Sequence, residues 1–330
     1  MQADRVKSHP STTRNHNGSA ATGTARIAAN GDGGDRFEPS VARGARAWPP
    51  SWALPEIHTS SGGFETMRVY AGGIFRLQDH LVRLWATAQY LGLTIPMSQA
   101  ELGRRLHEAV ASSGIQEAIV RVALIPDTKR VVSPSIVVQP VPLPPPELYR
   151  RGIRLAVVPT KKFPVAQIDP QSKFSARLGS ILAVMDAQLR GADEALFLDE
   201  LGTITESTAS NFGMIKNGAF LAAPCSSGLL AGITWQVLLE LTGALKIPVH
   251  ETPLTRHDVY NADEAFLTSS IKEVLPVTVI DGRAIGGGKP GPVSARLQRA
   301  FSALVGREMG LATRAAGRPR RAGGAISGRR

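Results

Sequence analysis

The residue types with the most chemical potential lie between positions 173 and 273 of this 330-residue chain. Lys173 stands after a proline-containing loop and just before a segment with helical periodicity. An amine at such an entrance can face a cleft, where loss of water lowers its pKa and makes it nucleophilic. Glu206 follows the turn Leu201-Gly202-Thr203 and precedes a run of small polar residues. We expect this carboxylate to be half-buried and to face a protonated nitrogen, because a buried carboxylate without a cationic partner is costly.

Two further segments have the character of anion sites. Gly232-Ile233-Thr234 opens a predicted helix, so its free amides and the helix dipole favour an anion. Thr268-Ser269-Ser270 is a hydroxyl-rich turn at the end of a predicted strand. A nucleophilic amine, a carboxylate and two phosphate-binding segments are the groups that pyridoxal 5'-phosphate needs, since the lysine forms the imine and the acid keeps the pyridine nitrogen protonated. The sequence therefore predicts pyridoxal 5'-phosphate as the cofactor, and the scattered histidines predict no metal site.

The elements that must position these residues follow the hydrophobic pattern. In the first half we expect strands at about 65–70, 74–77, 118–124 and 131–138, a helix capped by Asp79 to about 90, and a helix capped by Ser98 to about 113. Five prolines between 140 and 146 then favour an extended connector.

In the second half we expect strands at about 153–158, 194–198, 264–268 and 277–280, a hairpin of 211–215 with 219–222, and helices at about 175–190, 234–245 and 292–305. Asn217-Gly218 suits the hairpin turn because it tolerates positive φ. Short strands, helices and hairpins together favour an α+β fold over a doubly wound parallel sheet.

Composition and charge define five segments. We predict a disordered extension over 1–61, a small N-terminal α+β domain over 62–142, a linker over 143–150, a larger C-terminal domain over 151–308 and a basic disordered tail over 309–330. The net charge of +11 belongs largely to the last segment, since residues 311–330 hold six arginines and no acid. That tail has no aromatic residue to stack on a base, which argues against nucleic acid as a partner.

The overall composition excludes several classes of protein. Apolar residues make up 43% and charged residues 20% of the chain, which is typical of a packed globular protein. No uninterrupted apolar run is long enough to span a membrane, so no membrane partner is predicted. Cys225 is the only cysteine, which excludes an internal disulfide and favours a reducing, cytoplasmic setting.

An ordered series of motifs also resembles the class IV (fold-type IV) pyridoxal-phosphate family, which includes branched-chain aminotransferases, D-amino-acid aminotransferases and aminodeoxychorismate lyases. The matching segments are Phe64–Tyr70, His80–Leu84, Lys173–Leu178, Gly191–Ala195, Ile204–Asn211, Gly232–Thr234, Phe266–Ser270 and Gly288–Val293. The resemblance implies a two-domain α+β fold with a C-terminal pseudo-barrel, the cofactor in the cleft between the domains, and a homodimer.

The resemblance also implies a role for individual residues. Lys173 matches the Schiff-base lysine that also moves the substrate proton, and Glu206 matches the acid that faces the pyridine nitrogen. The phosphate contacts correspond to Arg83, Ile233, Thr234, Ser269 and Ser270, and Leu230 corresponds to the residue that packs on the ring. Backbone amides near Ser270 and Ile271 are expected to meet the substrate carboxylate. Arg121 resembles a substrate-side arginine, although a surface arginine on an edge strand fits the pattern equally well.

The leading hypothesis is an aminotransferase that moves an amino group from a branched-chain-like amino acid to a 2-oxo acid by a ping-pong reaction. The alternatives are an aminodeoxychorismate lyase that forms 4-aminobenzoate and pyruvate, a D-amino-acid aminotransferase, and a non-catalytic protein that binds through its arginine tail. Arg177-Leu178 is closer to the lyase and D-amino-acid branches, and the aromatic segment that usually precedes the first motif is missing. These departures leave the substrate open.

Overall fold

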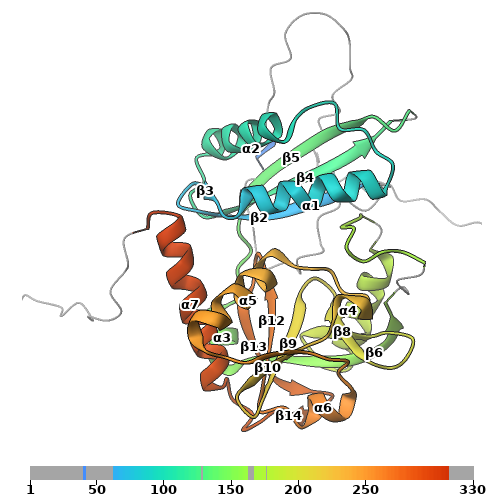
Figure 1. Ribbon diagram of the computed structural model, residues 1–330, viewed down its shortest axis with the longest axis vertical. Coiled ribbons are helices and arrows are strands. Elements are labelled where there is room, and N and C mark those ends of the chain that lie inside the picture. The colour runs from blue at the N-terminus through green and yellow to red at the C-terminus, as the bar shows by residue number, and fades with distance from the viewer. Residues whose placement is uncertain (1–39, 42–61, 128, 163–166, 176, 312–330) are drawn as a thin grey trace, which may run out of the picture. The chain divides into compact units, whose positions relative to one another are not determined.

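The computed structural model describes residues 40–41, 62–127, 129–162, 167–175 and 177–311 (Figure 1). Two sheets organise this part of the chain, one of five strands and one of nine. The predicted extension and arginine tail fall almost entirely outside the described residues; Ser40–Val41 forms the short strand β1.

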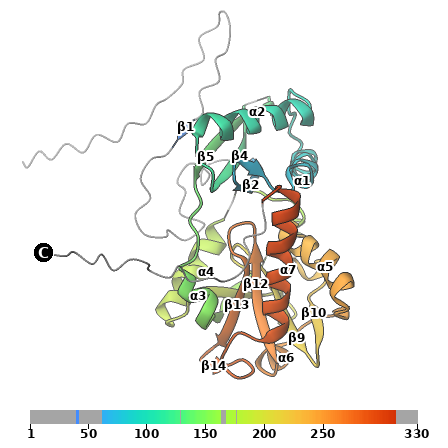
Figure 2. The ribbon, with the colours of Figure 1, turned by 90° about the vertical axis from the view of Figure 1, so that its left-hand side faces the viewer.

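The first sheet has the strand order β1-β5-β4-β2-β3. Its elements after β1 are β2 (Phe64–Tyr70), β3 (Gly73–Ile74), α1 (Leu77–Tyr90), α2 (Gln99–Ser113), β4 (Ala118–Pro126) and β5 (Val132–Pro140). Met67 and Val69 of β2 pack with apolar residues of both helices, so α1 and α2 cover one face of the sheet (Figures 1 and 2). By the alternation of a strand, Phe64 and Thr66 face the other side.

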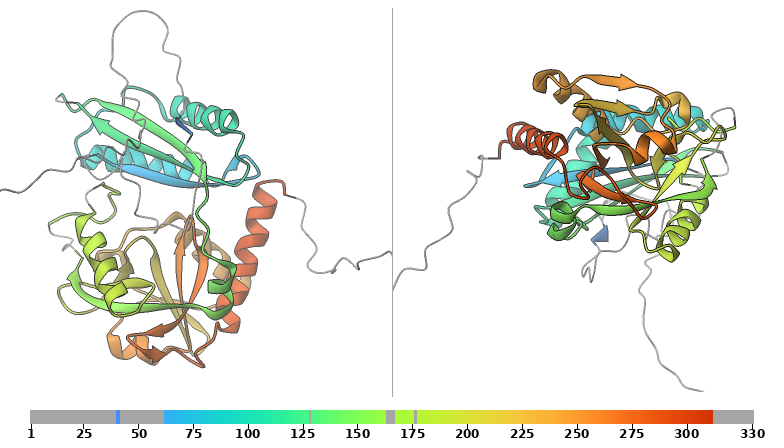
Figure 3. Two further views of the ribbon diagram at one scale, coloured as in Figure 1. Left: turned by 180° about the vertical axis from the view of Figure 1, so that it is seen from behind. Right: turned by 90° about the horizontal axis from the view of Figure 1, so that it is seen from below.

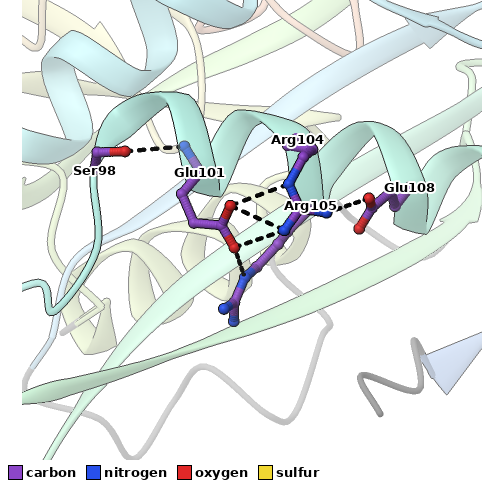
Figure 4. Close-up of polar contacts among 5 residues, drawn as sticks. All are labelled: Ser98, Glu101, Arg104, Arg105 and Glu108. Carbon is purple, nitrogen blue, oxygen red and sulfur yellow. Dashed lines mark hydrogen bonds and ion pairs between the residues drawn. The ribbon is translucent and has the colours of Figure 1, made fainter. Parts of the chain in front are cut away.

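The two helices begin in different ways. The Ser98 hydroxyl accepts a hydrogen bond from the Glu101 amide (3.1 Å), which confirms the predicted cap of α2. Figure 4 shows that Glu101 also pairs with the arginines of the next turn on this exposed face. The prediction that Asp79 caps α1 was wrong, because the helix begins at Leu77, before Asp79. Its N-cap is Arg76, which has a left-handed conformation (φ 52°) and forms ion pairs with Glu240 and Glu308.

The second sheet closes on itself. Its strands are β6 (Ile153–Lys161), β7 (Glu194–Leu198), β8 (Ile204–Ser207), β9 (Asn211–Lys216), β10 (Ala219–Ala222), β11 (Val249–Glu251), β12 (Glu264–Ser269), β13 (Glu273–Ile280) and β14 (Arg283–Ala284). The order runs β11-β10-β9-β12-β13-β6-β7-β8, and β8 also pairs with β9 through Glu206 and Asn211. The strands from β9 round to β8 therefore form the barrel-like domain that the family resemblance implied.

The barrel is buried on both faces. Leu155, Val157 and Leu196 point into its core, whereas the alternate residues Ala156 and Val158 pack against α4 (Leu178–Leu189). The outer face of β9, β10 and β12 is covered by α5 (Ile233–Leu245) and α7 (Pro292–Glu308). Figure 3 shows α4 and α7 on different sides of the barrel. Two short helices, α3 (Pro146–Arg151) and α6 (Arg256–Tyr260), complete the fold.

Most predicted elements are present, and the differences have local causes. The predicted helix at 175–190 begins only at Leu178, because Ser175 donates its amide proton to the Gly62 carbonyl (3.0 Å) and Phe64 donates to the Lys173 carbonyl (3.0 Å). Residues 204–207, which lie outside the predicted strands and helices, form the buried strand β8.

The segment predicted as an extended connector is partly helical. Helix α3 begins at Pro146, inside the predicted linker, because a proline is well accommodated at the first position of a helix. None of the helices in the described part of the chain has the length and apolarity needed to cross a membrane.

Candidate active site

A cavity of about 160 Å³ brings together residues from segments far apart in the chain. It is lined by side chains from β2, α1, the end of β6, the segment around Lys173, β8, the start of α5 and the end of β12. Most of the predicted site residues are in its lining, namely Arg83, Lys173, Glu206, Leu230, Ile233, Thr234, Ser269 and Ser270.

Lys173 is anchored through its backbone, and its amine is enclosed. The amide of Lys173 donates to the Thr87 hydroxyl (3.0 Å), and its carbonyl accepts from the Phe64 amide (3.0 Å). The ammonium nitrogen lies 4.9 Å from the centre of the Phe64 ring. Burial, assisted by the positive charge of Arg83, lowers the pKa of Lys173 to about 7. A substantial fraction of this amine is therefore neutral and nucleophilic near neutral pH.

Glu206 lies at the seam where β8 joins β9 and closes the barrel. One carboxylate oxygen accepts from the Lys162 ammonium at 2.6 Å, and the other accepts from the Asn211 amide group (3.3 Å) and the Leu230 backbone amide (3.2 Å). The predicted burial and cationic partner are both present, since the Glu206 side chain is only 10% exposed. These donors hold the carboxylate in one place beside the cavity.

Arg83 is positioned by a buried carboxylate. Its Nε and Nη2 donate to the two oxygens of Glu65 (2.6 and 2.9 Å), and its Nη1 donates to the Ala231 carbonyl (2.8 Å). His80 Nδ1 lies 2.8 Å from Glu65. Burial opposes ionisation of Glu65, but the charges of Arg83 and His80 outweigh it and hold the pKa of this carboxyl well below its ordinary value. Glu65 thus orients Arg83 toward the residues that precede α5.

The start of α5 and the end of β12 offer uncommitted donors to the cavity. Helix α5 begins after Gly232 without a side-chain cap, so its first amides are free to bind an anion. The Thr268 hydroxyl, on a residue 1% exposed, has no hydrogen-bond partner among the described residues. Together with Thr234 and Ser270, which also line the cavity, these groups form a cradle suited to a phosphate.

Gly232 keeps this end of the cavity open, which leads to a first prediction. A Cβ at position 232 would lie 2.1 Å from Oδ1 of Asn211, the residue that donates to Leu230 and Glu206. We expect Gly232→Ala to weaken binding of a phosphate-bearing cofactor by about tenfold or more, as measured by titration of the cofactor-free protein. Gly243→Ala, in the same helix with open space around it, should leave that affinity unchanged. Equal losses in the two variants would contradict the steric argument.

A buried ionic network supports the loop between β8 and β9. The Lys272 ammonium, on a residue only 2% exposed, pairs with Glu194 and donates to the Ser210 hydroxyl (3.1 Å). Glu194 also accepts from the Thr208 hydroxyl. The network ties the turn after β12 to the loop that carries Thr208 and Ser210, so both walls of the cavity are held together.

Two predicted residues do not line the cavity. Ile271 is buried just after the turn that ends β12. Arg121 contacts Phe64, with its guanidinium carbon 5.8 Å from the centre of the ring, and its Nε donates to the Thr66 hydroxyl (3.0 Å). The alternative interpretation of Arg121 as an edge-strand surface residue was wrong, because β4 lies between β5 and β2 and Arg121 is 8% exposed.

Sequence reasoning missed three residues of the site. Lys162 and Arg177 line the cavity, and Asn211 holds Glu206 in place. Asn211 stood within a quoted motif, and Arg177 lay four residues after Lys173, so spacing could have suggested both. Nothing in the sequence pairs Lys162 with Glu206, because the contact depends on how the barrel closes.

Comparison with known proteins then decides the family. A family model described as amino-transferase class IV matches residues 62–280. This chain belongs to the class IV aminotransferase family.

Relatives in this family cover most of the chain. The branched-chain-amino-acid aminotransferase of Pseudomonas aeruginosa is 31% identical over 76% of this chain and 85% of the relative. The D-alanine aminotransferase of Listeria monocytogenes is 32% identical over 76% of this chain and 88% of the relative. Among solved structures, a T.th. branched-chain amino acid aminotransferase with pyridoxamine 5'-phosphate superposes with a TM-score of 0.71 at 29% identity, covering 77% of this chain and 87% of that one. The T.th. enzyme has also been solved in complex with N-(5'-phosphopyridoxyl)-L-glutamate.

Membership of the class IV aminotransferase family confirms the predicted fold class and establishes the chain as an enzyme that transfers amino groups. The hypothesis of a non-catalytic protein that binds through its tail is thereby set aside.

Proposed function

We propose that this class IV aminotransferase uses pyridoxal 5'-phosphate to move an amino group from a branched-chain amino acid to a 2-oxo acid. The observation that carries the proposal is the shared cavity, in which an amine with a pKa near 7 and a fixed carboxylate stand beside a free helix N-terminus. The branched-chain and pyridoxamine-phosphate relatives support the choice of substrate and cofactor.

The described residues fit this cofactor. The uncapped start of α5 and the unpartnered Thr268 hydroxyl provide donors for a phosphate. When bound, pyridoxal 5'-phosphate supplies an electron-withdrawing ring that accepts the electron pair left when the amino acid loses its Cα proton. Leu230 is assigned to the ring face. To the phosphate we assign Arg83, Ile233, Thr234, Ser269 and Ser270.

Lys173 performs two tasks in this scheme. Its neutral amine would be the nucleophile toward the aldehyde of the cofactor, and the same amine, when free, would be the base for the proton on the substrate Cα. The surrounding burial and the charge of Arg83 suit it to both, because they favour the neutral form near pH 7. The backbone contacts to Thr87 and Phe64 fix the position from which the amine reaches into the cavity.

Glu206 would keep a proton on the nitrogen of the pyridine ring. A carboxylate is required for this because its negative charge stabilises the protonated ring nitrogen. Lys162, Asn211 and the Leu230 amide orient it, so little reorganisation is needed when the ring binds. For the substrate carboxylate we retain the backbone amides near Ser270 and Ile271. Arg121 does not line the cavity, so we assign it only a contact with the Phe64 ring, which does.

The lowered pKa of Lys173 makes the uptake of cofactor depend on pH. Below pH 7 the amine is protonated and cannot attack, so we expect the rate at which cofactor-free protein captures pyridoxal 5'-phosphate to rise through a midpoint near pH 7. Stopped-flow absorbance of the lysine-bound cofactor measures it. Lys216→Ala, which removes an exposed lysine paired with Asp263, should show the same midpoint. A midpoint near 10.5, the ordinary value for lysine, contradicts the prediction.

We also propose a homodimer in which the partner covers α4. One side of α4 packs on the barrel through Ala183 and Ala187, but an opposite stripe of large apolar side chains is exposed. The stripe consists of Leu178, Leu182, Met185 and Leu189, which are 69%, 51%, 52% and 89% exposed. Light scattering should give twice the mass of the chain, and Leu182→Glu with Met185→Glu should give the monomer. A wild-type monomer contradicts this part of the proposal.

A cytoplasmic setting remains a prediction from the single cysteine.

The function is tested with purified protein, pyridoxal 5'-phosphate, L-leucine and 2-oxoglutarate, which should form glutamate. Replacing L-leucine with D-alanine tests the branch to which the Listeria relative belongs. Release of pyruvate from aminodeoxychorismate without a 2-oxo acid tests the lyase alternative. Failure to exchange nitrogen with any L- or D-amino acid overturns the proposal.

A further inference from the structure

A second hollow, of about 640 Å³, opens on the surface of the barrel domain, and no described residue lines both it and the cavity around Lys173. Its walls come from β6, the residues that follow α4, the helix α6, and the turn from β13 into β14. Figures 1 and 2 show α6 and β14 at the same end of the barrel. A hollow of this size is within the range that holds a nucleotide-sized ligand.

Four of the described residues that line this hollow are arginines. They are Arg154, Arg190, Arg256 and Arg283, and all of them are exposed. Among the same described residues the lining holds one acid, Asp281, so its formal charge is +3, from four arginines and one aspartate. Positive charges gathered around one hollow repel each other, and a bound anion relieves that repulsion.

The carboxylate of Asp281 is committed to the fold. One of its oxygens accepts the Val157 amide (2.8 Å), and the other accepts the Tyr260 hydroxyl (2.6 Å). Burial and this hydroxyl bond raise the pKa of Tyr260, whereas the positive charges of Arg283 and Arg256 oppose the rise, so both guanidinium groups act on this wall. The guanidinium carbon of Arg283 lies 4.4 Å from the centre of the Tyr260 ring.

The arginines of the hollow differ in their counter-ions. Arg190 pairs with Asp186, one turn earlier in α4 (3.1 Å). The other three form no ion pair with any residue that the structure describes. The Asp193 carboxylate accepts the backbone amide of Arg154 (2.8 Å), and Arg283 donates to a backbone carbonyl, that of residue 281 (3.3 Å). Since each guanidinium has five N–H donors, most of those in the hollow are available to a ligand.

We propose that this hollow binds a linked polyphosphate, the chain of phosphate groups that inorganic triphosphate and nucleoside triphosphates share. The three arginines without an ion pair stand on separate elements, β6, α6 and β14, so a ligand that meets them together carries several anionic groups. A phosphate presents acceptor oxygens in several directions, whereas a carboxylate presents two in one plane, and guanidinium forks pair well with phosphate. A recessed hollow also favours a compact ligand over an extended nucleic-acid backbone.

The test is a calorimetric titration of the full chain, loaded with pyridoxal 5'-phosphate so that the phosphate cradle of the other cavity is filled. We expect Arg154→Gln, Arg256→Gln and Arg283→Gln each to weaken binding of inorganic triphosphate about fivefold, and the last two combined to weaken it about 20-fold, as for exposed charged contacts at independent positions. The matched control is Arg299→Gln, an exposed arginine of α7 outside the hollow, which should leave the affinity unchanged.

A comparison of ligands identifies the source of the phosphates. Tighter binding of ATP than of inorganic triphosphate, lost in the same variants, supports a nucleotide, and equal or weaker binding of ATP supports the phosphate chain alone. Orthophosphate or citrate bound as tightly as triphosphate, or no binding of triphosphate, overturns the proposal. So does tighter binding of a single-stranded oligonucleotide.

The control variant separates a site from the general attraction of a basic chain. An equal loss in Arg299→Gln would show that net charge alone holds the triphosphate, and the proposal would then fail. Because the altered side chains are exposed, all variants should unfold at the wild-type midpoint. The readout is binding, so the result stands whether or not the protein transfers amino groups.

Discussion

Replacing Lys173 with alanine is expected to lower the rate of amino transfer by about 10⁴-fold or more, since the change removes the nucleophile and the general base together. The visible absorbance of the lysine-bound cofactor should disappear as well. The fold should persist, because the contacts of residue 173 to Thr87 and Phe64 are made by its backbone.

Lys173→Arg distinguishes chemistry from charge. Arginine keeps a cation beside the Phe64 ring but stays protonated, so it can neither attack nor accept a proton. We expect it to be as inactive as the alanine variant and to lack the same absorbance. Activity of the arginine variant within about tenfold of wild type would show that position 173 supplies only charge.

The second large effect is expected for Glu206→Gln, which should lower kcat by about 10²- to 10³-fold. An amide carries no charge to hold the proton on the ring nitrogen, and the Lys162 ammonium loses its partner at 2.6 Å. The change should also appear without turnover, as a lower pKa of the ring nitrogen of the bound cofactor, followed by its absorbance as a function of pH.

Glu264→Gln provides a matched control for this experiment. Glu264 is another buried carboxylate in the same barrel, but it accepts the amides of Val293 (2.9 Å) and Ser294 (2.7 Å) at the start of α7. We expect Glu264→Gln to lower the midpoint of unfolding while leaving the titration of the bound cofactor unchanged. A similar spectral change in both variants would indicate a general loss of structure.

Local patterns in the sequence were sufficient for most elements and for the chemical roles. The apolar residues of β6, the Ser98 cap and the Asn217-Gly218 turn are short-range features, and each is present in the structure. Lys173 and Glu206 could be assigned to a cofactor because amine and acid chemistry is a property of the residue types. The start of α4 was misplaced because the competing partner, residues 62–64, lies far away in the chain.

The sequence by itself determined the fold class and the chemical groups of the site: an α+β chain, a lysine, an acid and two anion-binding turns. The tertiary structure decided how those groups are paired. Only closure of the barrel between β8 and β9 brings Lys162 to Glu206, and only the docking of β2 beside residue 173 encloses Lys173 and Arg177 around Phe64. The physical reason is that burial and opposing charges act through space. The lowered pKa of Lys173 therefore exists only once distant strands have met.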